Sequence, residues 1–353
     1  MKVAFPLFSL GQSGGTKVIV RLANYLEGRG HDVTLLVPRR NRNSHVHTNA
    51  RIVELNPLLM PDRPALSRFR TLPVAFPMAG LLRDYDVVVA NYSPTVLPTK
   101  MSGNVRTTYY YLVQHDETIF FPPFSIEYWI ARLSYGAMKT SRFFAVSHWL
   151  MDMIRERTGC DSTLLPPGID HDTFYPRKVV ERDDREVLVL ARHEWWRGIQ
   201  TFSDAMDIVK KELPDVHIRA VGKPIRTLRT KCRVTYGMPS DDELAGLYSS
   251  CGAFVLPSVL EGLPVPPLEA MACGSPVVLT DCLGTRDYAV NNGNCMMVSP
   301  CDVSGMAEAI IRALSDHELA SRLRASGVEC ARIWTYERMC EIFSSELERN
   351  AQH

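Results

Sequence analysis

Short apolar segments alternate with helical patterns along the whole chain. A strand with one wet face alternates apolar and polar residues, whereas a strand covered on both faces is apolar throughout. The second kind is found at residues 87–90, 109–113 and 143–146. Ahead of them, apolar residues at helical spacing run from Val18 to Leu26, and Gly28 and Gly30 end this predicted helix. The pattern predicts parallel sheets with helices packed on both faces.

A proline-rich segment divides this pattern into two halves. It covers residues 164–176, and strand and helix patterns resume after it. We expect further strands at residues 187–191, 216–221, 253–257 and 276–280. A helix is predicted from residue 241, because Ser240 and Glu243 have the spacing of a capping box. The chain is therefore predicted to be an α/β protein with two Rossmann-like, doubly wound domains and a cleft between them.

The composition is typical of a folded enzyme with two domains. The chain has 353 residues, of which 46% are hydrophobic and 22% are charged, and domains of roughly 100–200 residues are usual. Nine cysteines without a C-x-x-C pair do not indicate a disulfide framework or a zinc site. The opening residues do not resemble a signal peptide, and no apolar run approaches the ~20 residues that cross a bilayer. These features predict a cytoplasmic protein.

The distribution of charge bears on the partners of the chain. A net charge of +1 argues against nucleic acid. Residues 1–175 nevertheless hold 19 Lys and Arg against 14 Asp and Glu. Part of this excess comes from Arg39, Arg40, Arg42, Arg63, Arg68, Arg70 and Arg83. Such a basic half suits a peripheral contact with the inner membrane face or a phosphorylated acceptor, and an ordinary solvated surface is the alternative that stays open.

Two carboxylates, Glu261 and Glu269, have the most informative spacing in the chain. Glu261 is expected in a loop after a strand, and Glu269 in the first turn of a helix that begins near Pro266. Free N–H groups at the start of a helix attract phosphate. A nucleotide sugar bound there would meet a carboxylate at each end. The spacing alone is equally compatible with one acid that favours the helix dipole and one incidental loop acid.

The segment that starts at Glu261, EGLPVPPLEAMACGSPVV, resembles the E-x7-E signature of the retaining GT-B glycosyltransferases of family 4. The resemblance implies the GT-B fold, with an acceptor domain at residues 1–168 and a nucleotide-sugar donor domain at residues 169–336. It also implies that a C-terminal helix, residues 337–353, returns to the first domain.

The resemblance assigns roles to residues of this signature. Glu261 is expected to contact the hydroxyls of the donor sugar, and Glu269 is expected to bind the nucleotide ribose. Pro264 stands where the signature often has a glycine, which removes one N–H donor. The backbone contacts to the donor are therefore expected at Gly262, Leu263 and Val265.

Two arginines follow the strand at residues 187–191. Family members that resemble this segment, ARHEWWRG, carry an arginine at the strand end and a lysine further on, both of which hold the diphosphate. Arg192 fits the first position, and Arg197 stands where the lysine is expected. A guanidinium supplies the same charge. Because two fixed cations can stabilise the departing diphosphate, we expect no metal and no cofactor, with the nucleotide-diphosphate sugar as donor substrate.

Two glycine-containing loops are expected to touch the donor. Gly14 and Gly15 end the loop GQSGG after the first strand, where glycine lets the backbone approach a ligand closely. By the resemblance, this loop contacts the donor phosphates or faces the acceptor. A second loop, ahead of the helix at residue 241, is expected beside the nucleobase through Gly237 and Met238.

A histidine follows the strand at residues 109–113, at the sheet edge where ligands gather in α/β proteins. The resemblance places this His115 near the donor sugar and the reacting centre. Asp116 beside it is expected to orient the ring or to bind the acceptor. Eight aromatic residues lie between residues 109 and 129, and they either stack on sugar rings or belong to the core or a lid.

The sequence therefore predicts a retaining glycosyltransferase that moves a sugar from a nucleotide diphosphate to a hydroxyl group of a glycan, a glycolipid precursor or a small metabolite. Two other functions stay open: a nucleotide-sugar epimerase of the same fold and a non-catalytic subunit that binds nucleotide sugar. A nicotinamide oxidoreductase is disfavoured, because the G-x-G-x-x-G fingerprint is absent after the first strand.

Overall fold

The computed structural model describes residues 1–351 apart from residues 12, 43–45, 57–71, 178–180, 193, 223–231 and 237–238, and it leaves undescribed the side chains of residues 40, 72–74, 232–236 and 351. The chain forms two compact units. Unit 1 comprises Met1–Pro166 and Glu337–His353, and unit 2 comprises Pro167–Tyr336. The first division lies in the proline-rich segment, close to the boundary expected at residue 168.

Unit 1 is built on a parallel sheet of seven described strands in the order β3-β2-β1-β4-β5-β6-β7. Its strands are β1 (Lys2–Pro6), β2 (Asp32–Pro38), β3 (Arg51–Leu55), β4 (Val87–Ala90), β5 (Thr108–Val113), β6 (Arg142–Ala145) and β7 (Ser162–Leu164). Val3 of β1 pairs with both Val33 and Val87, so the chain order reverses between β1 and β4. Ligands bind at such a switch point in doubly wound sheets.

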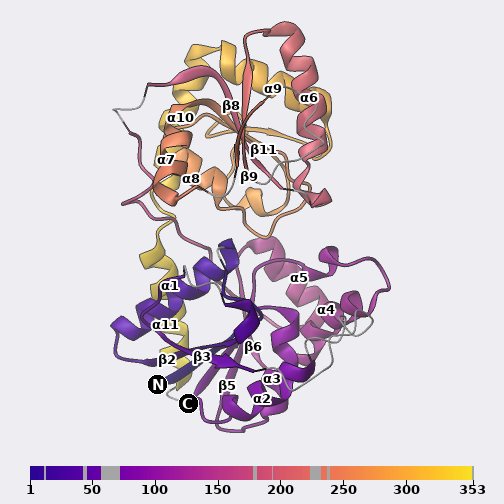
Figure 1. Ribbon diagram of the computed structural model, residues 1–353, viewed down its shortest axis with the longest axis vertical. Coiled ribbons are helices and arrows are strands. Elements are labelled where there is room, and N and C mark those ends of the chain that lie inside the picture. Colours follow the sequence, from indigo (N-terminus) through magenta and orange to yellow (C-terminus); the bar gives the residue numbers. More distant parts are fainter. Residues whose placement is uncertain are drawn as a thin grey trace. The chain divides into compact units, whose positions relative to one another are not determined.

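Helices cover both faces of this sheet. They are α1 (Gly14–Gly28), α2 (Leu72–Leu82), α3 (Ser93–Ser102), α4 (Ile126–Ala137), α5 (His148–Thr158) and α11 (Tyr336–Ala351). In Figure 1, α1 and α11 lie on one side of the sheet, and α2 and α3 lie on the other. The alternation of side chains along β1 explains this division: Ala4 packs with Met78 of α2, whereas the ring of Phe5 lies 6.1 Å from that of Phe343 in α11.

Unit 2 contains a second parallel sheet, whose described strands have the order β10-β9-β8-β11-β12-β13. These strands are β8 (Asp183–Ala191), β9 (His217–Gly222), β10 (Cys232–Tyr236), β11 (Cys251–Leu256), β12 (Val277–Thr280) and β13 (Met296–Val298). The chain order reverses between β8 and β11, which are direct neighbours. The segments that follow these two strands are the ones that contain the predicted arginines and Glu261.

The helices of unit 2 are α6 (Ile199–Glu212), α7 (Asp241–Ser250), α8 (Pro266–Ala272), α9 (Val303–Ser315) and α10 (His317–Ala331). In Figure 1, α6 and α9 lie on one side of the sheet, and α7, α8 and α10 lie on the other. Phe202 of α6 and Ile310 of α9 share one buried apolar cluster with Val189 of β8. The capping box at the start of α7 is confirmed, because Ser240 and Glu243 each bond to the backbone of the other.

The chain passes between the units twice, and the two passages touch. The backbone N–H of Ile169 donates to the carbonyl of Trp334 at 2.9 Å. Beside this bond, a Cβ at Gly168 would lie 2.2 Å from the carbonyl carbon of Thr335. Glycine is therefore required where the outgoing and returning segments cross.

The two parallel, doubly wound units confirm the fold class expected from the sequence. None of the described helices is both long enough and apolar enough to cross a membrane.

Phe343 is expected to be a principal anchor of α11 in the core of unit 1. Its ring is fully buried and lies 5.0 Å from that of Phe144. We expect Phe343→Ala to lower the free energy of unfolding by ~3–5 kcal/mol, measured by urea titration. Phe76→Ala on the exposed side of α2 makes the same chemical change and should alter the free energy of unfolding by less than ~0.5 kcal/mol. Equal losses in the two variants would contradict this role of Phe343.

Candidate active site

Close backbone contact holds the loop after β8 against the loop after β11. Gly198 has a φ of +63°, and a Cβ there would lie 1.8 Å from the carbonyl oxygen of Pro257. The N–H of Val259 donates to the carbonyl of Trp196 at 2.7 Å. Only glycine combines this left-handed conformation with this approach. The short 3-10 helix Trp195–Arg197 is therefore fixed beside the end of β11.

The loop after β12 supports Glu261 from the other side. The N–H of Glu261 donates to the carbonyl of Cys282 at 3.1 Å. A Cβ at Gly284 would lie 2.3 Å from the carbonyl oxygen of Gly262. Three loops at the carboxyl edge of the unit 2 sheet are thus packed backbone to backbone, and Glu261 lies among them.

The carboxylate of Glu261 is buried and forms an ion pair with Arg197. The hydroxyl of Ser258 donates to Glu261 Oε1 at 2.8 Å. Arg197 keeps an unused donor, because its buried Nε has no hydrogen-bond partner in the described part of the chain. The structure therefore brings two of the predicted residues, Arg197 and Glu261, into direct contact. Ser258 is a partner that the sequence analysis missed.

Arg192 follows β8 directly and is half-buried. Burial, with a smaller contribution from the neighbouring Arg197, lowers the pKa of its guanidinium. An arginine side chain nevertheless remains protonated in proteins. Arg192 forms no hydrogen bond or ion pair with any described residue. Glu261 and Glu194 offset the desolvation only in part, because their charges act from a distance. A desolvated cation without a direct ion pair costs free energy, which an anion bound beside it would offset.

Glu269 lies in the first turn of α8, as the proline pair predicts. The hydroxyl of Tyr248 in α7 donates to Glu269 Oε2 at 3.4 Å. Burial raises the pKa of this Tyr248 hydroxyl well above its usual value, so it stays a donor. Tyr288 also donates, to the carbonyl of Pro264 at 3.0 Å. These two tyrosines support the turn between the acids, and no spacing in the sequence points to them.

The expected backbone contacts fall in two places. Gly262, Leu263 and Val265 lie between β11 and α8, on the loop that Tyr288 supports, and Gly262 and Leu263 are buried. Gly237 and Met238, which are expected beside the nucleobase, lie outside the described residues.

In unit 1, the two glycines of the first loop belong to a helix. Gly14 and Gly15 are the first residues of α1, and the N-cap Ser13 accepts a hydrogen bond from the N–H of Thr16. A Cβ at Gly15 would lie 3.0 Å from the side chain of Gln114. The first turn of α1 thus lies against the side chain of Gln114, the residue before His115.

His115 lies at the carboxyl end of β5, half-buried between two aromatic rings. The ring centroids of Phe120 and Trp149 lie 4.9 Å and 6.4 Å from that of His115. His115 Nδ1 lies 3.2 Å from the backbone carbonyl oxygen of Asp116. The hydroxyl of Tyr135 in α4 donates to the carbonyl of His115 at 3.3 Å.

The carboxylate of Asp116 is directed to Arg157 rather than to the His115 ring. Arg157 donates to both carboxylate oxygens, at 2.9 Å and 2.7 Å, and the hydroxyl of Thr118 donates to Oδ1 at 2.7 Å. These hydrogen bonds and the positive charge of Arg157 lower the pKa of Asp116 despite its burial. Asp116 therefore contacts the imidazole through its backbone carbonyl, while its side chain ties the loop to α5.

Glu117 is a buried acid that the sequence analysis did not identify. One carboxylate oxygen accepts the N–H of Ser93, the first residue of α3, at 2.7 Å. The other accepts the hydroxyl of Tyr111 at 3.3 Å. Burial raises the pKa of Glu117 to about 7. This side chain joins the segment after His115 to the start of α3.

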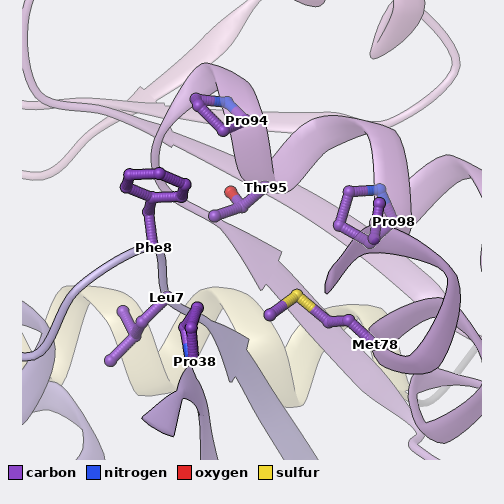
Figure 2. Close-up of a pocket in the computed structure, with 8 residues that line it drawn as sticks. Leu7, Phe8, Pro38, Met78, Pro94, Thr95 and Pro98 are labelled. Atoms are coloured by element: carbon purple, nitrogen blue, oxygen red, sulfur yellow. The ribbon is translucent and has the colours of Figure 1, made fainter. Parts of the chain in front are cut away.

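A small apolar pocket of about 20 Å³ lies at the carboxyl edge of the unit 1 sheet. Figure 2 shows how side chains from the ends of β1 and β2 and from α2 and α3 surround it. It is lined by Leu7, Phe8, Pro38, Ala75, Met78, Pro94, Thr95 and Pro98. The hydroxyl of Thr95 is already engaged, since it donates to the carbonyl of Tyr92 and accepts the N–H of Asn91. The pocket therefore offers apolar contact rather than groups that recognise a sugar.

Among the described residues, one group combines carboxylates with an imidazole in the way a metal ion requires. It consists of Asp183, Glu186 and His217, at the amino ends of β8 and β9. Arg219 donates to Glu186 Oε2 at 2.7 Å, so a cation there would compete with a guanidinium. The group lies at the opposite edge of the sheet from Arg192 and Glu261, because it is found where the strands begin.

Two family models match the chain in consecutive segments. Residues 12–173 match the model described as Glycosyltransferase Family 4. Residues 172–329 match the model described as Glycosyl transferases group 1. The junction of the two matches lies close to the division between unit 1 and unit 2.

Two curated relatives are similar to part of the chain. A Bacillus subtilis protein named for teichuronic acid biosynthesis, TuaC, is 27% identical over 178 residues, which is 48% of this chain and 45% of that protein. The N,N'-diacetylbacillosaminyl-diphospho-undecaprenol alpha-1,3-N-acetylgalactosaminyltransferase of Campylobacter jejuni is 27% identical over 148 residues, 41% of this chain and 39% of that protein. The matches thus span less than half the length of these two relatives.

A solved structure resembles the whole chain. The sucrose-phosphate synthase of Thermosynechococcus elongatus superimposes with a TM-score of 0.83 and 19% identity, covering 99% of this chain and 98% of that one. At this identity the likeness concerns the fold, and it confirms the GT-B architecture predicted from the sequence.

The raised pKa of Glu117 predicts a dependence of stability on pH. A carboxyl group whose pKa is about 7 when folded and 4.5 when unfolded binds its proton more tightly in the folded state. It therefore destabilises the fold by ~3 kcal/mol as the pH rises from below 4.5 to above 7. Glu117→Gln removes this titration. The free energy of unfolding of the variant, compared with that of the wild type at the same pH, should therefore increase from pH 5 to pH 8.

Urea unfolding at both pH values measures this difference. Glu156→Gln, an exposed change on α5 in the same unit, serves as the control and should keep the pH dependence of the wild type. An unchanged pH dependence in Glu117→Gln would show that Glu117 does not titrate in this range.

Proposed function

We propose that this chain transfers a sugar from a nucleotide diphosphate to a hydroxyl group with retention of the anomeric configuration. It belongs to the glycosyltransferases of family 4 and group 1, as the models that match its two halves indicate. Unit 2 binds the donor, and unit 1 binds the acceptor. The positive charge that stabilises the departing diphosphate comes from arginine side chains rather than from a metal ion.

The observation that carries this proposal is the pair of cations at the switch point of unit 2. Arg192 is desolvated and forms no direct ion pair with a described residue, although the charges of Glu261 and Glu194 act on it from a distance. Arg197 beside it is neutralised by Glu261 yet keeps a buried donor without a partner in that same set. An anion with several oxygens would satisfy both guanidinium groups, and a diphosphate has this chemistry.

The transfer step follows from this arrangement. The acceptor oxygen forms a bond to the anomeric carbon while the bond between that carbon and the diphosphate oxygen breaks. The acceptor proton passes to the departing phosphate oxygen on the same face of the sugar, which retains the configuration. Arg192 and Arg197 stabilise the negative charge that develops on this leaving group.

The remaining predicted residues orient the donor and the acceptor. Glu261 accepts hydrogen bonds from hydroxyls of the donor sugar, and Glu269 accepts from the ribose. His115 lies near the sugar that is transferred, and the backbone of Gly14 and Gly15 approaches the phosphates or the acceptor. The backbones of Gly262, Leu263 and Val265 contribute N–H groups to the donor. The contact with the base that the sequence assigns to Gly237 and Met238 falls outside the described residues.

The acceptor that we propose is a precursor of a cell-surface glycan, linked to a lipid. The names of the two relatives support this choice, because one refers to teichuronic acid and the other to a sugar linked through diphosphate to undecaprenol.

The proposal is tested by turnover of nucleotide sugars in the presence of lipid-linked acceptors, with the anomeric configuration of the product read by NMR. We expect the product to have the same anomeric configuration as the donor. The kcat/KM of Glu261→Gln should be 30–100-fold lower than that of the wild type, since a charged hydrogen bond contributes ~2–3 kcal/mol. Glu186→Gln also breaks a buried ion pair with an arginine, but at the other edge of the sheet. It should lose stability and keep its turnover.

Two outcomes would contradict the proposal. Conversion of the nucleotide sugar to its epimer without acceptor would identify an epimerase, and binding without turnover across the panel would identify a non-catalytic subunit. Glu261→Gln with wild-type kcat/KM would remove Glu261 from the site.

Arg192 predicts opposite effects on stability and binding. Arg192→Met removes a desolvated cation, so the free energy of unfolding should stay the same or rise. The affinity for UDP, GDP, ADP or dTDP, measured by calorimetric titration, should fall 30–100-fold with the loss of a charged contact of ~2–3 kcal/mol. Arg219→Met, which removes the partner of Glu186, should lower stability and leave this affinity unchanged. Loss of stability in Arg192→Met without loss of affinity would mean that Arg192 is structural.

A further inference from the structure

The outer face of α4 is apolar, which is the reverse of an ordinary surface helix. Ile126, Trp129, Ile130 and Leu133 are 51%, 44%, 43% and 65% exposed. Their spacing of three, four and seven residues places them on one face of the helix. We call this set the α4 stripe. Figure 1 shows α4 at the periphery of unit 1.

The opposite face of α4 packs against unit 1. The α4 stripe is therefore the outer face of a helix whose inner face is already buried. Ala131, Ser134 and Tyr135 are buried. The hydroxyl groups of Ser134 and Tyr111 lie 3.2 Å apart, and Tyr135 donates to the carbonyl of His115. The orientation of the helix is thus fixed by hydrogen bonds on its buried side.

The residue that precedes the N-cap of α4 extends the apolar surface. Phe124 is 81% exposed, and its backbone has a φ of +66°. This conformation is unfavourable for a bulky side chain. Its ring lies 6.4 Å from that of Tyr128, which in turn lies 5.6 Å from that of Trp129. Aromatic rings therefore continue from Phe124 to the α4 stripe.

The charges around the α4 stripe select the kind of partner. Between residues 121 and 142, Glu127 is the single acidic residue, whereas Arg132, Lys139 and Arg142 are basic and exposed. A second copy of this chain would bring the same basic residues together in a two-fold interface. An anionic lipid surface instead attracts these residues and accepts the apolar and aromatic side chains at the level of the headgroups.

We propose that Phe124 and the α4 stripe dock this chain on an anionic membrane surface, with α4 lying in the plane of the interface. This surface differs from the arginines between residues 39 and 83 that the sequence suggests for a membrane contact. Because the opposite face of α4 holds the segment that contains His115, docking would place that segment about one helix diameter, ~10 Å, from the lipid interface. The docking itself does not depend on the proposed transfer reaction.

Sedimentation with vesicles tests the proposal without any activity measurement. The full chain should bind vesicles of equal parts phosphatidylcholine and phosphatidylglycerol, and binding should weaken as salt is added. The double variant Trp129→Gln and Leu133→Gln should bind at least tenfold more weakly. The matched control, Phe76→Gln with Leu81→Gln on α2, replaces two equally exposed apolar side chains and should bind like the wild type.

A second set of variants tests the charge. Arg132→Gln with Lys139→Gln should weaken binding to the anionic vesicles and have little effect on pure phosphatidylcholine. Three results would overturn the proposal: no binding of the wild type, equal binding of the wild type and the Trp129 and Leu133 variant, or a dimer in solution that this variant converts to a monomer. The last result would identify the α4 stripe as an interface between two copies.

Discussion

An unbalanced positive charge at the carboxyl edge of the unit 2 sheet is the constraint on which the candidate site depends. Two arginines meet one buried carboxylate there, and Arg192 forms no direct ion pair with a described residue. Gly198 and Gly284 hold the surrounding loops so close that a side chain at either position would collide with backbone. The packing of these loops therefore holds Arg192 in a desolvated position where a bound anion would be stabilising.

In unit 1, the buried charged groups are paired with hydrogen-bond donors. Its buried acids, Asp116 and Glu117, are both supplied with donors, from Arg157 and from the first N–H of α3. They fix the segment that contains His115. Unit 1 thus supports the segment around His115 rigidly, whereas unit 2 holds a desolvated arginine without a direct ion pair among the described residues.

Much of this could be predicted from the sequence. Strands such as β4 and β5 are buried on both faces, so their apolar runs are unambiguous, and the acids of the E-x7-E segment lie in a single stretch of chain. The short strands β3, β7 and β13 have weaker patterns, because edge strands need less apolar surface. Ser258, Tyr248 and Glu117 were missed since their roles depend on contacts between distant segments. The spacing in α4 predicts a helix, but it does not tell which face is buried.

The crossing of the two connecting segments has a consequence for biosynthesis. Phe343, which completes the core of unit 1, is separated from the rest of that unit by the whole of unit 2 in the chain. Because α11 follows unit 2 in the chain, unit 2 can finish folding during synthesis while unit 1 still lacks α11. Until then the apolar surface around Phe5 and Phe144 is exposed to other nascent chains. The arrival of α11 thus determines when this apolar surface of unit 1 is covered and protected from aggregation.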